Sequence, residues 1–384
     1  MGWYVRNGET SVSWQIIRGD ARALPLDDAT VDLIVTSPPY WSLRSYRDGG
    51  EHYQGQVGSE STPQQFVDEL VGMIDGEWRR VLKPSGSMFL NLGDKYAGSG
   101  GHNNSAIGAD SERGPSWYPK GLEQARAKSL LGLPWRIALA LIDRGWILRA
   151  EIIWSKPNGL PESVQDRVRR SHEQVFHFVV EPRYYSAVDE IRTPGEVDRP
   201  QRSRAVEIAE AAGLTPAHLA AAKAVGVSDV GRGASVQTGA GKNTAEVLRL
   251  AGEAKDALGG YFREWLGSPA LGRLPGSVWN IPTQPLIIPD THRKHYSLPD
   301  HFAAYPPELV RRIVLGWSPK GGLVCDPMCG TGTTLGVAHK LGRYAIGVDL
   351  SMDYARLARW RIADSGHFSM VDDRTAAEAQ GRLL

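Results

Sequence analysis

Apolar and polar residues follow two different periods along this chain, and the changes between them predict where strands and helices lie. Short apolar runs predict strands over 13–17, 31–35, 87–92, 146–154, 173–180, 322–325 and 344–348. Apolar residues spaced three and four apart predict helices over 63–82, 130–143 and 335–341. Strands that alternate with helices indicate an α/β fold with a layered sheet.

Residues 190–275 interrupt this alternation. Helical patterns cover 204–212, 216–225 and 244–265, and the first two are joined by Gly213, Leu214 and Thr215. Thr215 suits an N-cap and Pro216 the first helical position, which is compatible with a helix-turn-helix that contacts DNA. A helical hairpin without that function has the same pattern. The nearby glycine-rich stretch 239–243 is not a phosphate loop, since Val236 and Asn243 occupy positions that need glycine and Ser/Thr.

The stretch 95–125 is rich in glycine, serine and asparagine and is too long for a tight connection. It is either a surface loop or a mobile loop that orders over DNA or substrate. The predicted organisation is therefore an α/β domain in two halves, over 1–189 and 276–384, with a helical region over 190–275 between them. The stretch 95–125 belongs to the first half.

Composition narrows the class of protein. The chain has 384 residues and a net charge of +1 at pH 7. No apolar stretch approaches membrane-spanning length, and the N-terminus lacks the apolar core of a signal peptide. Both cysteines, Cys325 and Cys329, lie close together, without the Cys/His pairs of a zinc site or a disulfide framework. We therefore expect a cytoplasmic protein without a metal site.

The net charge gives no sign of nucleic-acid binding, but binding needs only a basic face. Local basic clusters occur at 167–170, 199–204 and 293–295. Each is either a phosphate contact or an ordinary solvated surface.

The segment Thr36-Ser37-Pro38-Pro39-Tyr40-Trp41 directly follows the apolar run 31–35. Each proline fixes its own φ, removes an N–H donor and restricts the residue before it, so the turn is stiff. The Ser37 hydroxyl and the carbonyls of Ser37 and Pro38 then form a group of acceptors beside the Tyr40 ring. Such a group suits a flat ring that carries an amine, although a plain Pro-Pro turn has the same sequence.

A glycine- and threonine-rich loop, Asp326-Pro327-Met328-Cys329-Gly330-Thr331-Gly332-Thr333-Thr334, follows a short strand. A helical pattern and a second strand come next, and that strand ends at Asp349. Glycine lets a backbone approach a ligand closely, and an acidic residue at the next strand end suits ribose hydroxyls. This arrangement predicts a nucleotide-like ligand.

Together these two segments resemble the amino-group DNA methyltransferases that use S-adenosylmethionine. The order of the motifs, with Ser-Pro-Pro-Tyr first and the glycine loop near the C-terminus, is similar to the β class. The resemblance implies a Rossmann-like sheet with circularly permuted motif order and a mainly helical inserted target-recognition region at 190–275. It covers nearly the whole chain except about 95–125 and 190–275.

The resemblance also implies roles for single residues. Ser37, Pro38, Pro39 and Tyr40 would form the catalytic corner, with Tyr40 stacked on a base flipped out of the duplex. Trp41 would either extend that stacking wall or pack in the core. The cofactor residues would be Asp20, Asp326, Pro327, Gly330, Thr331, Gly332, Thr333 and Asp349. Among them, Asp349 would bind the ribose, Asp20 would face the adenine amine or close a turn, and Thr331 and Thr333 would lie near the methionine carboxylate.

Three further segments match the family pattern less specifically. The run 300–306 is expected to lie over the methionine end of the cofactor. Lys156-Pro157-Asn158 and His172-Glu173 are expected to have structural or substrate-lining roles.

A serine before Pro-Pro-Tyr mostly accompanies cytosine N4 in this family, and an aspartate mostly accompanies adenine N6. The expected activity is therefore methylation of cytosine N4 in duplex DNA, with adenine N6 as the alternative and an RNA or protein acceptor left open. A Rossmann-type oxidoreductase lacks support because the loop has no third glycine. A DNA-binding regulator with an inactive methyltransferase fold is the non-enzymatic alternative.

The expected partner is double-stranded DNA, and no membrane partner is expected. A cognate restriction enzyme and a homodimer are left open by the sequence.

Overall fold

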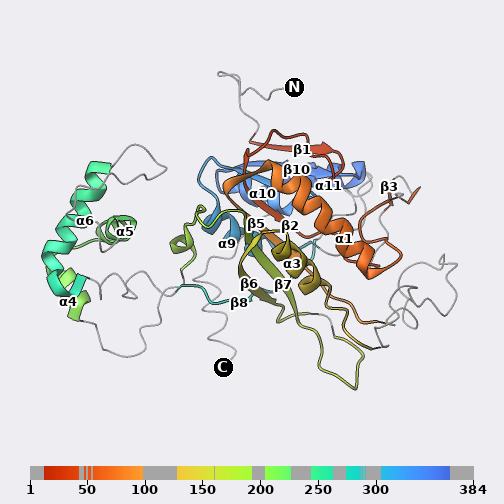
Figure 1. Ribbon diagram of the computed structural model, residues 1–384, viewed down its shortest axis with the longest axis horizontal. Coiled ribbons are helices and arrows are strands. Elements are labelled where there is room, and N and C mark those ends of the chain that lie inside the picture. The colour runs from red at the N-terminus through yellow and green to blue at the C-terminus, as the bar shows by residue number, and fades with distance from the viewer. Residues whose placement is uncertain are drawn as a thin grey trace. The chain divides into compact units, whose positions relative to one another are not determined.

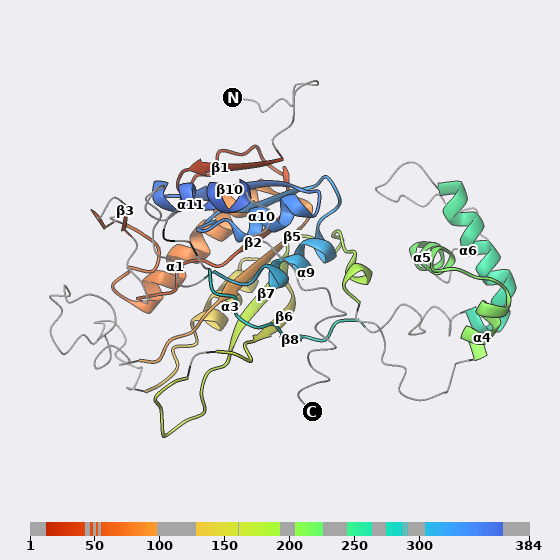
Figure 2. The ribbon, with the colours of Figure 1, turned by 180° about the vertical axis from the view of Figure 1, so that it is seen from behind.

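The computed structural model describes residues 13–42, 47–48, 51–52, 55–97, 128–159, 161–192, 204–225, 244–262, 274–286, 288, 290 and 304–363. The chain divides into two compact units: unit 1 comprises residues 1–190 and 276–384, and unit 2 comprises residues 191–275. Figure 1 and Figure 2 show the chain from opposite sides. No helix among the described residues is long and apolar enough to cross a membrane.

An eight-stranded sheet forms the centre of unit 1, and the predicted α/β fold is confirmed. In spatial order its strands are β1 (Trp14–Arg18), β10 (Tyr344–Asp349), β9 (Leu323–Asp326), β2 (Val31–Thr36), β5 (Leu82–Leu92), β7 (His172–Val179), β6 (Ile147–Ser155) and β8 (Val278–Asn280). The first five strands are parallel, whereas β7 runs antiparallel to both neighbours. The short strand β8, which the sequence did not predict, pairs with the outer edge of β6. Two further short strands, β3 (Arg47–Asp48) and β4 (Glu51–His52), pair with each other in a separate antiparallel sheet.

The two distant parts of the chain meet at the centre of this sheet. β2 pairs with β9 through Leu33 and Val324 and through Ile34 and Cys325. The Asp32 carboxylate strengthens the junction, because it accepts the Leu323 N–H at 2.8 Å and the Lys83 ammonium at 2.7 Å. This pairing brings the Ser-Pro-Pro-Tyr corner and the glycine loop to neighbouring strand ends.

Side chains of β5 alternate between two helical layers, as expected for a strand covered on both faces. Met88, Leu90 and Leu92 pack in one core cluster with buried side chains of α1 (Pro63–Met73) and α3 (Leu133–Asp143). Phe89 points to the other face, where its ring lies 4.8 Å from that of Trp317 in α9 (Pro307–Trp317). α9 packs on α10 (Thr333–Lys340), and α10 packs on α11 (Met352–Ala363). The sequence patterns did not identify α9 or α11.

Helix α1 begins at the predicted residue because of a capping box. The Thr62 hydroxyl accepts the Gln65 N–H at 3.1 Å, and the Gln65 side chain accepts the Thr62 N–H at 3.1 Å. The predicted single helix over 63–82 is interrupted, since a π-helical turn, η1 (Ile74–Trp78), precedes the short α2 (Arg79–Val81). β5 then starts at Leu82, five residues before the predicted strand.

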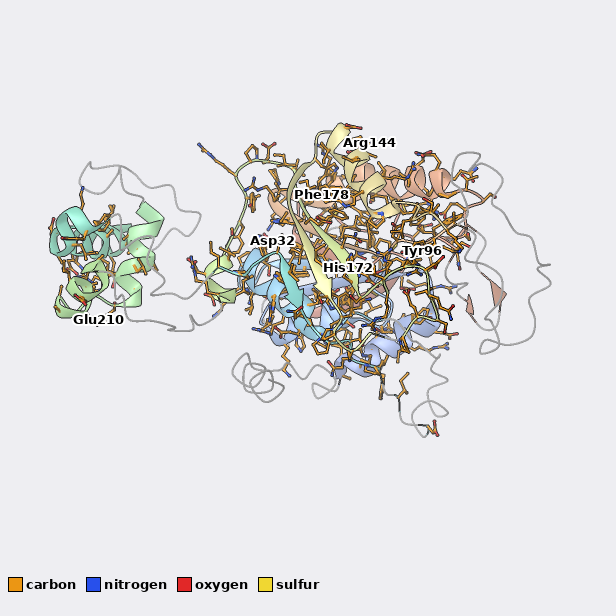
Figure 3. The ribbon with its side chains drawn as sticks, turned by 90° about the horizontal axis from the view of Figure 1, so that it is seen from below. Asp32, Tyr96, Arg144, His172, Phe178 and Glu210 are labelled. Carbon is orange, nitrogen blue, oxygen red and sulfur yellow. The ribbon has the colours of Figure 1, made fainter. Side chains whose placement is uncertain are left out.

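Asp94 sets the beginning of α3. Its carboxylate accepts the N–H groups of Gly132 and Leu133 at 3.0 and 3.1 Å, which satisfies donors that a helix start leaves unpaired. Gly132 has a φ of 68°, so the helix cannot extend back to residue 130 as predicted. Tyr96 and Leu130 form an isolated antiparallel bridge, and Figure 3 labels Tyr96. Most of the predicted mobile loop, residues 98–127, lies outside the described residues.

Unit 2 contains α4 (Arg204–Ala211), α5 (Pro216–Val225), α6 (Thr244–Leu258) and the 3-10 turn η3 (Gly259–Tyr261), and another 3-10 turn, η2 (Val188–Ile191), precedes it in the chain. α4 ends in a Schellman motif at Gly213, whose φ is 69°. The Leu214 N–H bonds to the Ala209 carbonyl at 2.9 Å and the Gly213 N–H bonds to the Glu210 carbonyl at 3.0 Å. The three helices enclose a small core of mainly alanine side chains. The α-helix predicted over 244–265 ends at Leu258, where two glycines follow.

Candidate active site

The predicted site residues meet at one edge of the sheet. Asp20 follows β1, Ser37 follows β2, the glycine loop follows β9, and Asp349 ends β10. Because these four strands are parallel, their carboxyl ends lie at the same edge. A cavity at this edge encloses about 960 Å³, including its mouth open to solvent. The predicted residues that line it are Asp20, Ser37, Pro39, Asp326, Pro327, Gly330, Thr331, Thr333 and Asp349.

Three predicted site residues do not line this cavity: Pro38, Tyr40 and Gly332. Gly332 has a φ of 74° and lies at the N-cap of α10. A Cβ atom on Gly332 would come within 2.8 Å of the Ala358 Cβ in α11. Both facts require glycine at this position for backbone conformation and helix packing.

Asp349 organises the glycine loop through backbone groups. Its carboxylate accepts the Gly330 N–H at 2.8 Å and the Ser351 N–H at 2.8 Å. Asp349 also lines the cavity, so it is close to any ligand that this loop holds.

Arg361, which no sequence pattern identified, holds the threonines of the loop. It lies in α11, is 3% exposed, and donates to the Thr331 carbonyl and hydroxyl at 2.7 Å each. It also donates to the Thr333 hydroxyl at 3.0 Å. Burial lowers the pKa of Arg361 to about 10, so it remains charged at neutral pH. A cation thus lies behind the loop, with the threonine oxygens turned toward it.

The Asp326 carboxylate is buried and holds other residues of the site in place through hydrogen bonds. It accepts hydrogen bonds from the Thr334 hydroxyl at 2.6 Å, the Tyr305 hydroxyl at 3.0 Å and the Met328 N–H at 3.2 Å. Burial raises its pKa, and hydrogen bonds oppose that rise. Tyr305 belongs to the run 300–306, of which residues 300–303 lie outside the described residues, and it lines the cavity. Asp326 therefore fixes the wall that Tyr305 contributes.

Asp20 closes a turn, which is one of the two roles expected of it. Its carboxylate accepts the Arg22 N–H at 2.9 Å, which closes the turn after β1, and it also lines the cavity. The Arg22 guanidinium bonds to Asp20 and, at 2.6 Å, to Glu69. Asp20 is thus a turn residue that also lines the cavity.

The Ser-Pro-Pro-Tyr corner rests on a polar cluster from three strands. The Ser37 hydroxyl donates to the Tyr40 hydroxyl at 3.3 Å, and the Tyr40 hydroxyl donates to the Glu173 carboxylate at 2.7 Å. Asn91 from β5 lies within 3.2 Å of Ser37, Tyr40 and Glu173. Lys156, which follows β6, pairs with Glu173. The expectation of structural or substrate-lining roles at 156 and 173 did not include this contact with Tyr40.

The Tyr40 ring packs on backbone. A Cβ atom on Gly93 would come within 2.4 Å of the ring, so this position has no room for a side chain. Trp41, in contrast, is 3% exposed and donates to the Glu60 carbonyl at 2.9 Å. The hypothesis that Trp41 extends a stacking wall is wrong, because its ring belongs to the core.

The parallel strands, the glycine loop and the acidic strand ends are the arrangement of α/β enzymes that bind a nucleotide-like cofactor. A family model described as DNA methylase matches residues 31–359. The chain therefore belongs to the N6/N4 amino-group DNA methyltransferase family, whose methyl donor is S-adenosylmethionine.

Individual relatives agree with this assignment. The chain is 32% identical to the type II methyltransferase M.SmaI of Serratia marcescens, over 91% of each protein. It is 30% identical to the type II methyltransferase M.XycI of Xanthomonas campestris pv. cyanopsidis, over 90% of this chain and 87% of the relative. A solved structure of the cytosine-N4-specific PvuII DNA methyltransferase shares the fold with a TM-score of 0.52 at 15% identity, covering 97% of this chain and 93% of that one. The chain is thus a site-specific DNA methyltransferase of the type II kind.

Proposed function

We propose that this enzyme methylates the exocyclic N4 amine of a cytosine flipped out of duplex DNA. The observation that supports this choice is Ser37, since serine at the first position of the Pro-Pro-Tyr motif mostly accompanies cytosine N4 in the family. Ser37 lines the same cavity as the glycine loop, so a base amine at Ser37 can face a donor held by that loop.

An exocyclic amine is a poor nucleophile because its lone pair is delocalised into the ring. Hydrogen bonds from its N–H groups to the Ser37 hydroxyl oxygen and the Pro38 carbonyl would draw the nitrogen toward sp³ geometry. The same fixed dipoles would stabilise the positive charge that develops on the nitrogen. Alignment of the amine with the methyl group supplies the remaining advantage, since positioning of this kind is worth several kcal/mol.

The cavity fits S-adenosylmethionine, which supplies a sulfonium-activated methyl group when bound. We assign the ribose hydroxyls to Asp349 and the adenine amine to Asp20. We assign the methionine carboxylate to the loop at Thr331 and Thr333. Two carboxylates at strand ends and a loop backed by the Arg361 cation match the hydroxyls, amine and carboxylate of this ligand.

We assign recognition of the DNA sequence to unit 2, on which α4 and α5 form a helical hairpin with a Schellman turn. Reading of base edges needs a few side chains in a groove, and a helix of this hairpin is suited to present them. Deletion of residues 204–258 should then abolish methylation of DNA while unit 1 still binds the cofactor.

The test is nucleoside mass spectrometry of DNA incubated with the protein and S-adenosylmethionine. The expected product is N4-methylcytosine, and N6-methyladenine alone would overturn the choice of base. Asp349→Asn keeps the shape of the side chain and should raise the cofactor Kd about tenfold, because one acceptor charge is lost. Isothermal titration calorimetry measures that change, with Glu181→Gln, an exposed carboxylate past β7, as the matched control.

A further inference from the structure

A directed chain of hydroxyl groups ends at Glu173. Ser37 donates to Tyr40, and Tyr40 donates to Glu173. A carboxylate can only accept while it is ionised, so it fixes the direction of every O–H bond in this chain. The Ser37 hydroxyl hydrogen therefore points toward Tyr40, and its oxygen lone pairs face away from Tyr40. One of them receives an Asn91 N–H at 3.2 Å.

Glu173 is held ionised in a place that disfavours charge. Its side chain is 17% exposed and lies against Asn91 and Lys156. Burial by itself raises the pKa of Glu173. The Lys156 ammonium and the hydrogen bonds from Lys156, Tyr40 and Asn91 outweigh burial, so the pKa is lowered overall. Lys156 is oriented in turn by the Trp154 ring, whose centroid lies 4.3 Å from its Nζ atom.

We propose that Glu173 is a positioning residue for methyl transfer, which acts through the Tyr40 hydroxyl to keep the Ser37 oxygen an acceptor toward the base amine. This rests on the proposed function of the Ser-Pro-Pro-Tyr corner. A serine hydroxyl can rotate and present either its hydrogen or its lone pairs. A hydrogen directed at the amine would oppose an N–H donor, and Glu173 removes that orientation.

The proposal explains how a neutral serine can serve this chemistry. The negative charge stands two hydrogen bonds behind the serine, at Glu173, and still favours a developing positive charge on the amine. Lys156 keeps Glu173 ionised, because without the ammonium the buried Glu173 carboxyl would take up a proton. A protonated Glu173 could donate to Tyr40, and the direction of the chain would no longer be fixed.

The first test is a double-mutant cycle on kcat for DNA methylation. Glu173→Gln removes the charge, and Tyr40→Phe removes the hydroxyl but retains the ring. Each single substitution should lower kcat on the order of 10-fold to 100-fold, and the double variant should be no slower than Tyr40→Phe. The cofactor Kd should be unchanged in all three, and Glu181→Gln should match the wild type.

The second test is the pH dependence of kcat, which a purely structural role would not alter. Lys156→Met leaves Glu173 buried without its cation, so its pKa rises and kcat falls toward acid pH within the range from about pH 6 to 8. Lys156→Arg keeps the cation and should retain the wild-type profile. Glu173→Gln should be slow at every pH in this range.

The outcomes separate this proposal from the proposed function. Methylation of DNA by the wild type, together with additive effects in the cycle and a pH profile of Lys156→Met like that of the wild type, overturns the role of Glu173 alone. Absence of any methylated base with the wild-type protein overturns both.

Discussion

The cofactor loop and the catalytic corner are built on the same plan with opposite charge. In the loop, the hydroxyl oxygens of Thr331 and Thr333 accept hydrogen bonds from the buried Arg361 cation. In the corner, the Ser37 hydroxyl donates to Tyr40 and the Tyr40 hydroxyl donates to the Glu173 anion. In the loop both hydroxyls contact the buried charge, whereas in the corner Ser37 is linked to it through Tyr40.

The difference lies in what each pair leaves for a ligand. Threonines whose oxygens face a cation keep their O–H hydrogens to donate, which suits an anionic group such as a carboxylate. A serine whose hydrogen is directed toward an anion keeps a lone pair, which suits an amine. In the proposed assignment of ligand groups, the sign of the buried charge decides which group each half of the site accepts, although both halves present hydroxyl groups.

The strongest test of this comparison removes the tyrosine. Tyr40→Ala should lower kcat by about 10²-fold to 10³-fold, since the hydroxyl link to Glu173 and the ring that we propose to stack on the base are both lost. The cofactor Kd should remain near the wild-type value, because the ring does not line the cofactor cavity. Calorimetry with S-adenosylmethionine checks this, and equal losses in kcat and affinity would indicate a folding role instead.

The converse change weakens the cofactor half. Arg361→Gln should raise the Kd for S-adenosylmethionine about tenfold to thirtyfold, because the loop loses its cation and the threonine hydroxyls lose their fixed direction. kcat at saturating cofactor should change less. Arg356→Gln is the matched control on the same helix, since Arg356 is half-exposed and pairs with Asp353. Similar Kd values for the two variants would contradict the assignment.

A smaller effect is expected from crowding the catalytic corner without altering any charge. Gly93→Ala places a Cβ atom where the Tyr40 ring lies, so the ring must shift and kcat should fall about tenfold. Gly72→Ala in α1 is the control, since no atom lies within 4 Å of its Cβ position. That substitution should instead stabilise the fold by about 0.5–1 kcal/mol, as alanine favours a helix over glycine. Chemical denaturation and single-turnover kinetics measure the two effects.

The smallest effect concerns a buried group outside both halves of the site. His177 stacks on Phe89, and burial with the nearby Arg149 charge lowers its pKa from 6.5 to about 3. At this position the unfolded chain binds a proton below pH 6.5 and the folded chain does not. The free energy of unfolding therefore decreases as the pH is lowered through this window. The loss should be about 1 kcal/mol between pH 7 and 5.5.

His177→Gln, an uncharged side chain at every pH in this range, should reduce that slope. Urea unfolding at both pH values measures it, and an unchanged slope would assign the acid sensitivity to another group.

Several helix boundaries could be predicted from the sequence because they depend on neighbouring residues. The apolar spacing after residue 62 predicted the start of α1, and the Thr215-Pro216 pair predicted the start of α5. Where a predicted helix boundary was wrong, the true boundary was set by the backbone conformation of a glycine or by a partner that is distant in the sequence. Gly132 and the Asp94 carboxylate make α3 begin at Leu133 and not at residue 130. Gly259, with a φ of 49°, ends the α-helical part of 244–265.

The candidate site divides in the same way. The Pro-Pro corner and the glycine loop are contiguous segments whose conformations depend on their own prolines and glycines, so the sequence by itself determined the family, the cofactor and most of the cavity lining. Trp41 shows the limit: an aromatic next to a motif is equally compatible with a ligand wall and a core, and only packing placed it in the core.

The charges that orient the hydroxyls were decided by tertiary structure alone. Tyr40 and Glu173 lie 133 residues apart, and Arg361 lies 30 residues from Thr331. No local pattern marks such pairs, because a lone Glu in a strand or Arg in a helix is usually a solvated surface residue. The pairing of β2, β5, β7 and β6 brings the corner, Asn91 and Glu173 into contact and buries them. Burial then makes the charge strong enough to direct its neighbours.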